Sequence, residues 1–282
     1  MRYPKPAAVL AACLAFLAAL VLPIALAGCS GSSAPKTDSS ATAASKLKEI
    51  VVGYESYPPY CYLGEDGTPL GIDMEIATEA FRRMGYRPTF KSIVWTDKDD
   101  LLASGAIDCI WCCFSMEGRE DDYTWAGPYL KSDEVVAVTR ESTIRTLADL
   151  NGKTIGVAAT SKPESILLNH TNPDVTAPKR VFSLQDSTYL YTSLGKGYVD
   201  AIVSHRLAVV QYEKDNDTEL RILDEPLGTM LTGVAFAKET TSDVPERLSR
   251  MFATMQKDGS MRDILAKYVD DPQDYLLGDS DV

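Results

Sequence analysis

The pattern that decides the fold occurs twice, as Ser-Gly-Ala-Ile-Asp at residues 104–108 and as Lys-Gly-Tyr-Val-Asp at residues 196–200. Glycine ends helices readily, because it adopts left-handed backbone angles without strain. The Ile-Asp and Val-Asp pairs that follow are typical of a chain entering a buried strand. Two such turns predict two similar lobes, each with its own sheet, and small-ligand sites favour the interface between lobes.

Strands and amphipathic helices alternate around both copies of this pattern. In the first half we expect strands at 50–53, 89–94 and 107–111, with helices at about 70–84 and 97–104. In the second half we expect strands at 154–157, 181–182 and 199–203, with helices from Pro163 and over 188–194. A final helix pair is expected at 244–267. This alternation predicts an α/β fold with mainly parallel sheets.

The N-terminus is the most specific segment of the sequence. Arg2 and Lys5 precede an apolar run over residues 7–27, and residues 26–29 read Leu-Ala-Gly-Cys. A charged start, an apolar core and small residues before a cleavage site describe an export signal. The run is also long enough for a permanent transmembrane anchor, but Pro23 interrupts it and its last four residues resemble a bacterial lipobox.

This resemblance implies cleavage after residue 28 and acylation of the Cys29 thiol with diacylglycerol. The next residues, to about 46, are rich in Ser, Ala and Thr and carry almost no large apolar side chains. Such a segment behaves as a flexible tether. We therefore predict a signal peptide at 1–28, a lipid-anchored linker at 29–45 and a globular body that works outside the cytoplasm beside the membrane.

The chain is strongly acidic, with 40 Asp and Glu against 28 Lys and Arg and a net charge of −12. A body of this charge repels phosphate backbones and anionic lipid surfaces. This excludes the nucleic-acid-binding classes of protein. The acidity says little about which small molecule is bound.

Four cysteines lie in the body: Cys61, Cys109, Cys112 and Cys113. An exported protein can keep a disulfide, and Cys61 could pair with Cys112 or Cys113. The close spacing of the last three cysteines is also compatible with zinc. A structural zinc usually needs a second pair of ligands, however, and the two histidines lie far along the chain. Small side chains at the end of a buried strand are the third interpretation.

A series of short segments resembles family 3 of the bacterial extracellular solute-binding proteins, the amino-acid-binding group. They include Val-Gly-Tyr-Glu-Ser-Tyr-Pro-Pro-Tyr at 52–60 and Trp-Ala-Gly-Pro-Tyr at 125–129. The other matching segments are 70–77, 101–108, 114–120, 147–157, 197–201 and 257–259. Each segment is weak by itself, but together they follow the family's order over residues 48 to 270.

The resemblance implies a two-lobed periplasmic-binding-protein fold of type II, with a hinge and a ligand cleft between the lobes. The first lobe would comprise residues 46–137 plus 234–282, and the second residues 138–233. The protein would capture an amino acid or a similar small carboxylate for an ABC transporter permease. It would act as a monomer tethered to the membrane through Cys29, without catalysis, cofactor or metal.

The resemblance also implies which residues bind the ligand's carboxylate. Arg119 matches the family's guanidinium, although the family often has one more residue between Ser115 and this arginine. Ser115 and the backbone of Cys113 match positions that hydrogen-bond the ligand. Thr160 and Ser161 precede an expected helix and would hold the carboxylate from the second lobe. Ser161 is equally suited to be an ordinary helix cap.

The remaining predicted contacts concern the ligand's side chain and ammonium. Tyr57 matches the aromatic wall of the family's cleft, and Glu55 matches the acid of the first lobe. His205 stands where the family usually places an aspartate. A neutral imidazole accepts one hydrogen bond from an ammonium, whereas a protonated one repels it. Two consequences are open if His205 lies in the cleft. The ligand is an atypical amino acid, a dicarboxylate or another anion, or Glu55 balances the ammonium alone. In the other interpretation, His205 is a surface histidine at the start of a helix.

Two other functions fit the same fold. The first is a lyase similar to cyclohexadienyl dehydratase, in which Glu55 and His205 would serve as acid and base. The second is a sensor that reports the ligand to a separate receptor. The sequence contains no evident nucleophile–base pair or set of metal ligands, which favours the binding protein over the lyase.

Overall fold

The computed structural model describes residues 47–278 of the chain. The predicted signal peptide at 1–28, the lipidation site at Cys29 and the linker at 29–45 lie outside these residues. Within 47–278, no helix combines the length and apolar character needed to cross a bilayer.

The first lobe is built around three parallel strands in the order β4-β1-β5. They are β1 (Lys48–Tyr54), β4 (Tyr86–Ser92) and β5 (Cys109–Ser115). Helix α1 (Ile72–Arg83) and helix α2 (Lys98–Ala103) connect them. A two-stranded ribbon, β2 (Tyr62–Leu63) and β3 (Pro69–Leu70), precedes α1, and the 3-10 turn η1 (Trp95–Asp97) precedes α2.

The second lobe repeats this architecture with parallel strands in the order β9-β7-β8. They are β7 (Thr154–Ala158), β8 (Arg180–Leu184) and β9 (Ala201–His205). Its helices are α3 (Lys162–Leu168), α4 (Tyr189–Gly195) and α5 (Arg206–Asn216), with the 3-10 turn η2 (Leu147–Leu150) before β7. The predicted alternation of strands and helices is confirmed in both halves.

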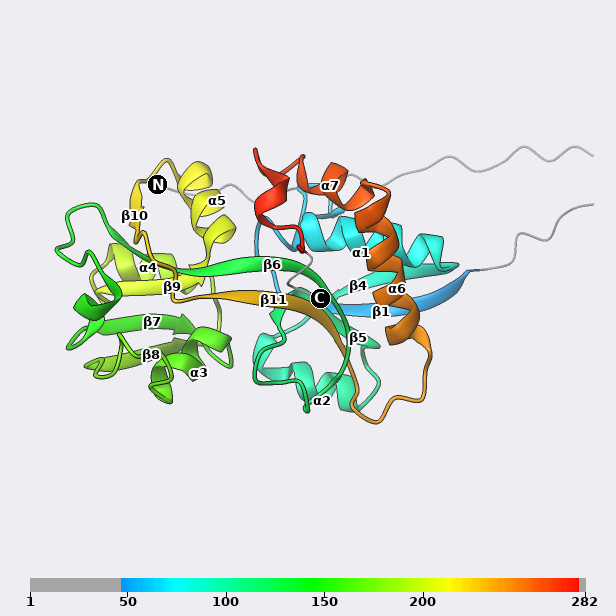
Figure 1. The fold of residues 1–282 in the computed structure, drawn as a ribbon, viewed down its shortest axis with the longest axis horizontal. Coiled ribbons are helices and arrows are strands. Elements are labelled where there is room, and N and C mark those ends of the chain that lie inside the picture. The colour runs from blue at the N-terminus through cyan, green and yellow to red at the C-terminus, as the bar shows by residue number, and fades with distance from the viewer. Residues whose placement is uncertain (1–46, 279–282) are drawn as a thin grey trace, which may run out of the picture. The chain divides into compact units, whose positions relative to one another are not determined.

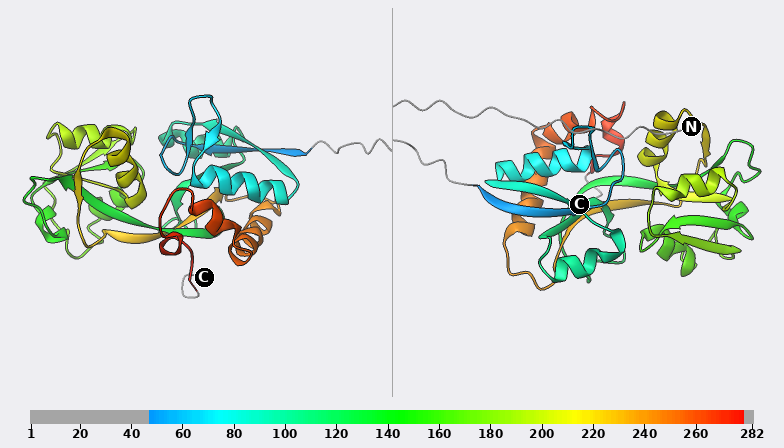
Figure 2. Two further views of the ribbon diagram at one scale, coloured as in Figure 1. Left: turned by 90° about the horizontal axis from the view of Figure 1, so that it is seen from above. Right: turned by 180° about the vertical axis from the view of Figure 1, so that it is seen from behind.

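Two long antiparallel strands run between the lobes: β6 (Thr124–Thr139) and β11 (Gly228–Phe236). β11 pairs with β5 of the first lobe and β6 pairs with β9 of the second, so all main strands form one hydrogen-bonded order, β4-β1-β5-β11-β6-β9-β7-β8. The short β10 (Leu220–Ile222) pairs with β6. Figures 1 and 2 show β6 and β11 passing side by side from one lobe to the other. A separate sheet for each lobe was therefore the wrong expectation.

The repeated turn does the same work in both lobes. Gly105 and Gly197 adopt left-handed angles, with φ of 71° and 70°. Three residues after each glycine, an aspartate carboxylate accepts the backbone N–H of a neighbouring strand. Asp108 accepts from Val51 of β1 at 2.6 Å, and Asp200 accepts from Thr154 of β7 at 2.7 Å. The predicted helix-to-strand turn is confirmed, and its aspartate ties the turn to the adjacent strand.

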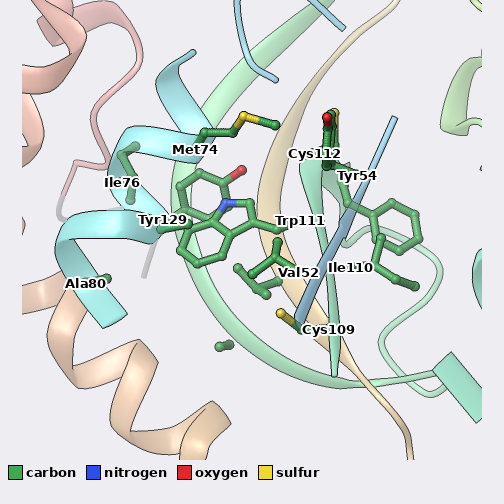
Figure 3. Packing of buried hydrophobic residues seen from close by; sticks show 14 of the residues in the cluster. Val52, Tyr54, Met74, Ile76, Ala80, Cys109, Ile110, Trp111, Cys112 and Tyr129 are labelled. Atoms are coloured by element: carbon green, nitrogen blue, oxygen red, sulfur yellow. The ribbon is translucent and has the colours of Figure 1, made fainter. Parts of the chain in front are cut away.

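An aromatic cluster fills the core of the first lobe. Trp111 of β5 is 1 % exposed, and its ring lies 5.5 Å from that of Tyr129 and 5.4 Å from that of Phe252. Phe252 belongs to α6 (Val244–Lys257), which with α7 (Ser260–Leu265) forms the predicted final helix pair; η3 (Pro272–Asp274) follows. Figure 3 shows Trp111 and Tyr129 packed together, with Met74 of α1 beside them. Trp111 thus belongs to the core.

Candidate functional site

A cavity lies between the two lobes, with a volume of about 600 Å³ including its open mouth. Its walls come from β5 and the loop after β1 in the first lobe, from the starts of α3 and α5 in the second, and from the connecting strand β6. The structure brings together there all of the site residues named from the sequence: Glu55, Tyr57, Cys113, Ser115, Arg119, Thr160, Ser161 and His205.

Arg119 reaches across the cavity from the first lobe to the second. Its Nη1 donates to the Ser115 carbonyl at 3.1 Å, and its Nη2 donates to the Thr160 carbonyl at 2.9 Å. The guanidinium carbon lies 5.1 Å from the ring centre of Phe114, a cation–π contact that orients the fork. Burial lowers the pKa of Arg119, but a guanidinium stays charged at neutral pH.

The start of α3 supplies the opposing wall. Ser161 is the N-cap of this helix, and its Oγ accepts the Glu164 N–H at 3.3 Å. Thr160 precedes it with a left-handed φ of 57°, and its N–H donates to Glu164 Oε2 at 2.6 Å. The capping role that the sequence left open is therefore real, and Ser161 also lines the cavity.

Lys98 is a cation near this wall that the sequence did not single out. It is 3 % exposed, and its Nζ donates to Thr160 Oγ1 at 3.3 Å. The same Nζ lies 5.3 Å from the ring centre of Trp95, which lines the cavity. Burial lowers the pKa of Lys98. Lys98 stands among Asp97, Asp99 and Asp100 in the sequence, as many exposed lysines do, so no local pattern could reveal its burial.

Tyr57 joins the lobes on another side of the cavity. Its hydroxyl lies 2.7 Å from Ser204 Oγ and accepts the His205 N–H at 3.2 Å. Its ring stacks on Tyr60, with ring centres 5.8 Å apart. Because Tyr57 and Arg119 both bond to residues of the second lobe, the structure represents a closed arrangement of the two lobes.

Glu55 lies in the cavity wall with a second carboxylate, that of Asp186, near it. Burial raises its pKa to about 7, and the nearby Asp186 carboxylate adds to this effect. The backbone N–H of Ser187 opposes it by bonding to the carboxylate. A carboxyl group with this pKa gains from the arrival of a cation, because the cation stabilises its ionised form.

His205 is buried, so the interpretation as a surface histidine is wrong. It is the N-cap residue of α5, yet it is only 6 % exposed. Its Nδ1 lies 2.9 Å from Ser132 Oγ, and its Nε2 lies 3.2 Å from Glu134 Oε1. Glu134 also lines the cavity and is 4 % exposed. Glu134 was not named from the sequence, although an acid directly before the apolar run Val135–Val138 was a usable signal.

A serine, a histidine and an acid lie together here, as in the catalytic triad of a hydrolase: Ser132, His205 and Glu134. The serine, however, is not accessible from the cavity. Ser132 does not line the cavity and is 3 % exposed. Its Oγ lies 2.9 Å from the Tyr60 hydroxyl in addition to its contact with the imidazole. A nucleophile must reach the substrate, so this group is arranged as a buried hydrogen-bond network.

The four body cysteines are free and buried, so Cys61 forms no disulfide with Cys112 or Cys113. Cys61 and Cys112 are in side-chain contact, and burial raises the pKa of both thiols. The Cys113 N–H donates to Asp73 Oδ2 at 2.6 Å, which holds the strand end that carries Ser115. Across residues 47–278, no three His, Cys, Asp or Glu side chains are grouped so that they could hold a metal ion.

Several proteins of known specificity are similar to this chain. The L-cystine-binding protein TcyJ of Escherichia coli is 29 % identical over 231 residues, covering 79 % of this chain and 84 % of that protein. The histidine-binding periplasmic protein of Salmonella typhimurium is 27 % identical, covering 82 % and 92 %. The crystal structure of Tv2483 bound to L-arginine matches with a TM-score of 0.71 at 28 % identity, covering 79 % and 90 %.

The family-level comparison agrees with these relatives and with the two-lobed architecture. The family model of the bacterial extracellular solute-binding proteins, family 3, matches residues 50–271. This match spans both lobes, the connecting strands and every residue of the cavity described above. The chain therefore belongs to family 3 of the bacterial extracellular solute-binding proteins.

Proposed function

We propose that this chain is the extracytoplasmic solute-binding component of an ABC importer and that it binds an amino acid, or a closely related small carboxylate. The observation that carries the proposal is one interlobe cavity lined by the guanidinium of Arg119 and by the carboxyl groups of Glu55 and Glu134. A molecule with both a carboxylate and an ammonium matches such a cavity. The relatives named for cystine, histidine and arginine bind this class of ligand.

Arg119 is the group we assign to the ligand's carboxylate. A guanidinium has five N–H donors in a planar fork, and two of them already bond to the carbonyls of Ser115 and Thr160. The remaining donors are available for a carboxylate. Ser115 and Ser161 add hydroxyls from the two lobes, so the same carboxylate would be held from both sides.

Ligand binding would favour the closed arrangement, because only that arrangement brings the groups of both lobes to one molecule. The strands β6 and β11 are the connections that would bend. The permease of the importer would then recognise the closed form. A lipid on Cys29 and a flexible segment at 29–45 would keep the monomeric body close to that permease.

We further propose that the chain is not an enzyme. The lyase alternative requires Glu55 and His205 to exchange protons with a substrate. His205 instead has both ring nitrogens within hydrogen-bonding distance of Ser132 and Glu134. One structural neighbour is described as an ancestral amino-acid-binding protein and a precursor of cyclohexadienyl dehydratase, but at 16 % identity it shares the fold alone.

The test is a thermal-shift screen of the purified body against amino acids and small carboxylates, followed by calorimetry. A ligand present at a hundred times its Kd adds about 2.7 kcal/mol of stability. Arg119→Ala should abolish the response, since no other arginine of residues 47–278 lines this cavity. The matched control is Arg87→Ala, which removes an exposed arginine of the same lobe. Retained binding in Arg119→Ala would refute the assigned site, and a negative screen of the wild type would refute the ligand class.

A further inference from the structure

The position at which the family resemblance expects an aspartate is occupied by His205, yet a carboxyl group lies directly beside it. Strand β9 pairs with β6 in an antiparallel register that sets His205 opposite Glu134. Directly opposed residues of neighbouring strands project from the same face of a sheet. Accordingly, His205 Nε2 lies 3.2 Å from Glu134 Oε1, and both residues line the cavity. The cavity thus has an acid on β6, opposite the position on β9 where the resemblance predicts one.

Glu134 is a buried acid with a defined side-chain partner. It is 4 % exposed, and its partner His205 is 6 % exposed. The imidazole is fixed in turn by Ser132, whose Oγ lies 2.9 Å from Nδ1 and 2.9 Å from the Tyr60 hydroxyl. Hydroxyls either donate or accept, so this chain of hydroxyls supports both neutral tautomers of the imidazole. His205 Nε2 can therefore accept a hydrogen bond from a protonated Glu134 or donate one to an ionised Glu134.

Burial and the surrounding charges favour the neutral forms of both Glu134 and His205 before a ligand binds. Burial raises the pKa of Glu134 to about 8; Arg119 opposes this rise and Glu117 adds to it. Burial lowers the pKa of His205 to about 4, and the Cys113 backbone and the Asp133 carboxylate oppose this shift only in part. The other titratable groups that interact with Glu134 are Tyr57, Cys113 and Tyr191. All three are neutral at pH 7, because burial raises the pKa of each.

We propose that Glu134, positioned by His205, meets the ammonium of the ligand in place of the aspartate that the family resemblance leads us to expect at position 205. This rests on the proposed function, and it specifies how the second charge of the amino acid is recognised. Glu134 and Arg119 face the same cavity and interact electrostatically. Glu134 would bind the ammonium and Arg119 the carboxylate of the same molecule. An ordinary α-amino acid therefore suits the site, although position 205 is a histidine.

Recognition at Glu134 involves the exchange of a proton for a cation. Below about pH 8 the empty site holds a proton on Glu134, and that proton must leave when the ammonium arrives. Binding therefore becomes tighter as the pH rises from 6 to 8 and releases protons at pH 7. Glu55, with a pKa of about 7, would contribute to the same trend if a cation reached it, so the two acids must be tested separately.

The experiment uses the tightest amino acid of the screen and its des-amino analogue, measured by calorimetry in buffers of different ionisation enthalpy. Removing the amino group should weaken binding to the wild type at least about tenfold at pH 8. In Glu134→Gln the same chemical change should alter affinity less than about threefold, and proton release should fall. Glu55→Gln keeps Glu134 in place and should therefore lose less of the amino group's effect than Glu134→Gln does. Glu141→Gln, an exposed glutamate just beyond β6, serves as the charge-matched control.

His205 is tested as a positioning residue by two amide variants. His205→Gln presents a donor near the place of Nε2 and should preserve the pH profile of affinity. His205→Asn keeps a group near Ser132 only, and should flatten the profile as Glu134→Gln does. The melting temperature without ligand shows whether each variant is folded.

The outcomes separate this inference from the proposed function. If Glu134→Gln remains folded and distinguishes the amino acid from its des-amino analogue as strongly as the wild type does, Glu134 does not meet the ammonium, while the amino-acid function stands. If Glu55→Gln alone removes the distinction, the ammonium binds at Glu55. If the wild type responds to no amino acid, the proposed function itself fails.

Discussion

The same residue type has the same role in the turn that precedes the third parallel strand of each lobe, as Asp108 in the first and Asp200 in the second. Each ends a glycine turn, and each carboxylate accepts a backbone N–H from the first strand of its own lobe, from Val51 and from Thr154. The backbone N–H of each aspartate also donates back, to the carbonyls of Val51 and Thr154 at 2.8 Å. A single residue thereby ties each turn to the neighbouring strand.

Asp108→Ala and Asp200→Ala should each lower the free energy of unfolding by about 1–2 kcal/mol, because each removes a hydrogen bond to a charged acceptor. Urea denaturation measures the change. Asp270→Ala, at an exposed aspartate, should leave the free energy within about 0.5 kcal/mol. Equal stability of Asp108→Ala and wild type would mean that water replaces the carboxylate without cost.

The loop that carries Arg119 depends on the element beside it. Trp125 at the start of β6 donates its Nε1–H to the Arg119 carbonyl at 3.0 Å. The pairing of β11 with β6 shifts register between Thr232 and Val234, and Gly233 lies at this irregularity. A Cβ at Gly233 would come within 2.7 Å of Met116 and 2.8 Å of Trp125. The glycine is thus required by close packing against the binding loop.

Gly233→Ala should therefore displace Trp125 or Met116. Overpacking of this kind costs about 1–3 kcal/mol of stability, and the shifted loop should also weaken ligand binding. Thermal unfolding and calorimetry on the same sample measure both effects. Gly195→Ala is the control, because within residues 47–278 a methyl group there would meet no atom within 4 Å beyond its own helix and chain neighbours. A Gly233→Ala protein with unchanged melting temperature and affinity would contradict the packing argument.

At the scale of the whole body, side-chain contacts between the lobes stabilise the closed arrangement, among them the contact of Lys98 with Thr160. Tyr57 bonds to Ser204 and to the His205 backbone, and Arg119 bonds to the Thr160 carbonyl. The connecting strands β6 and β11 are continuous through both lobes. Because these strands connect the lobes in either state, the balance between open and closed forms is set by the side-chain contacts and by the ligand.

Tyr57→Phe keeps the aromatic wall but removes both hydroxyl contacts. Each such hydrogen bond contributes about 0.5–1.5 kcal/mol and the two together about 1–3 kcal/mol. Affinity should therefore fall by about fivefold or more, and the ligand-free protein should become more open. Small-angle scattering and calorimetry provide the measurements. Tyr198→Phe changes an exposed tyrosine of the second lobe and should have no effect. An unchanged radius of gyration together with unchanged affinity would show that Tyr57 does not hold the lobes closed.

Local patterns along the chain were enough to predict the elements and the type of fold. Hydrophobic periodicity and glycine turns are local properties, so the strands around residues 50–53 and 154–157 and the final helix pair were predictable. The residues that line the cavity were named because short segments resemble a known family. The expected strands at 107–111 and 199–203 begin two residues later in the structure, at Cys109 and Ala201, since helix ends and strand starts depend on neighbouring strands.

Which groups act together, by contrast, depends on the assembled tertiary structure. The register of β6 against β9 sets Glu134 opposite His205, and neither residue type nor spacing encodes that pairing. The burial of Lys98 likewise depends on its contact with Thr160 of the other lobe, which is 62 residues away along the chain. Long-range strand pairing and desolvation are properties of the folded body. They bury His205 and make it the partner of the buried Glu134.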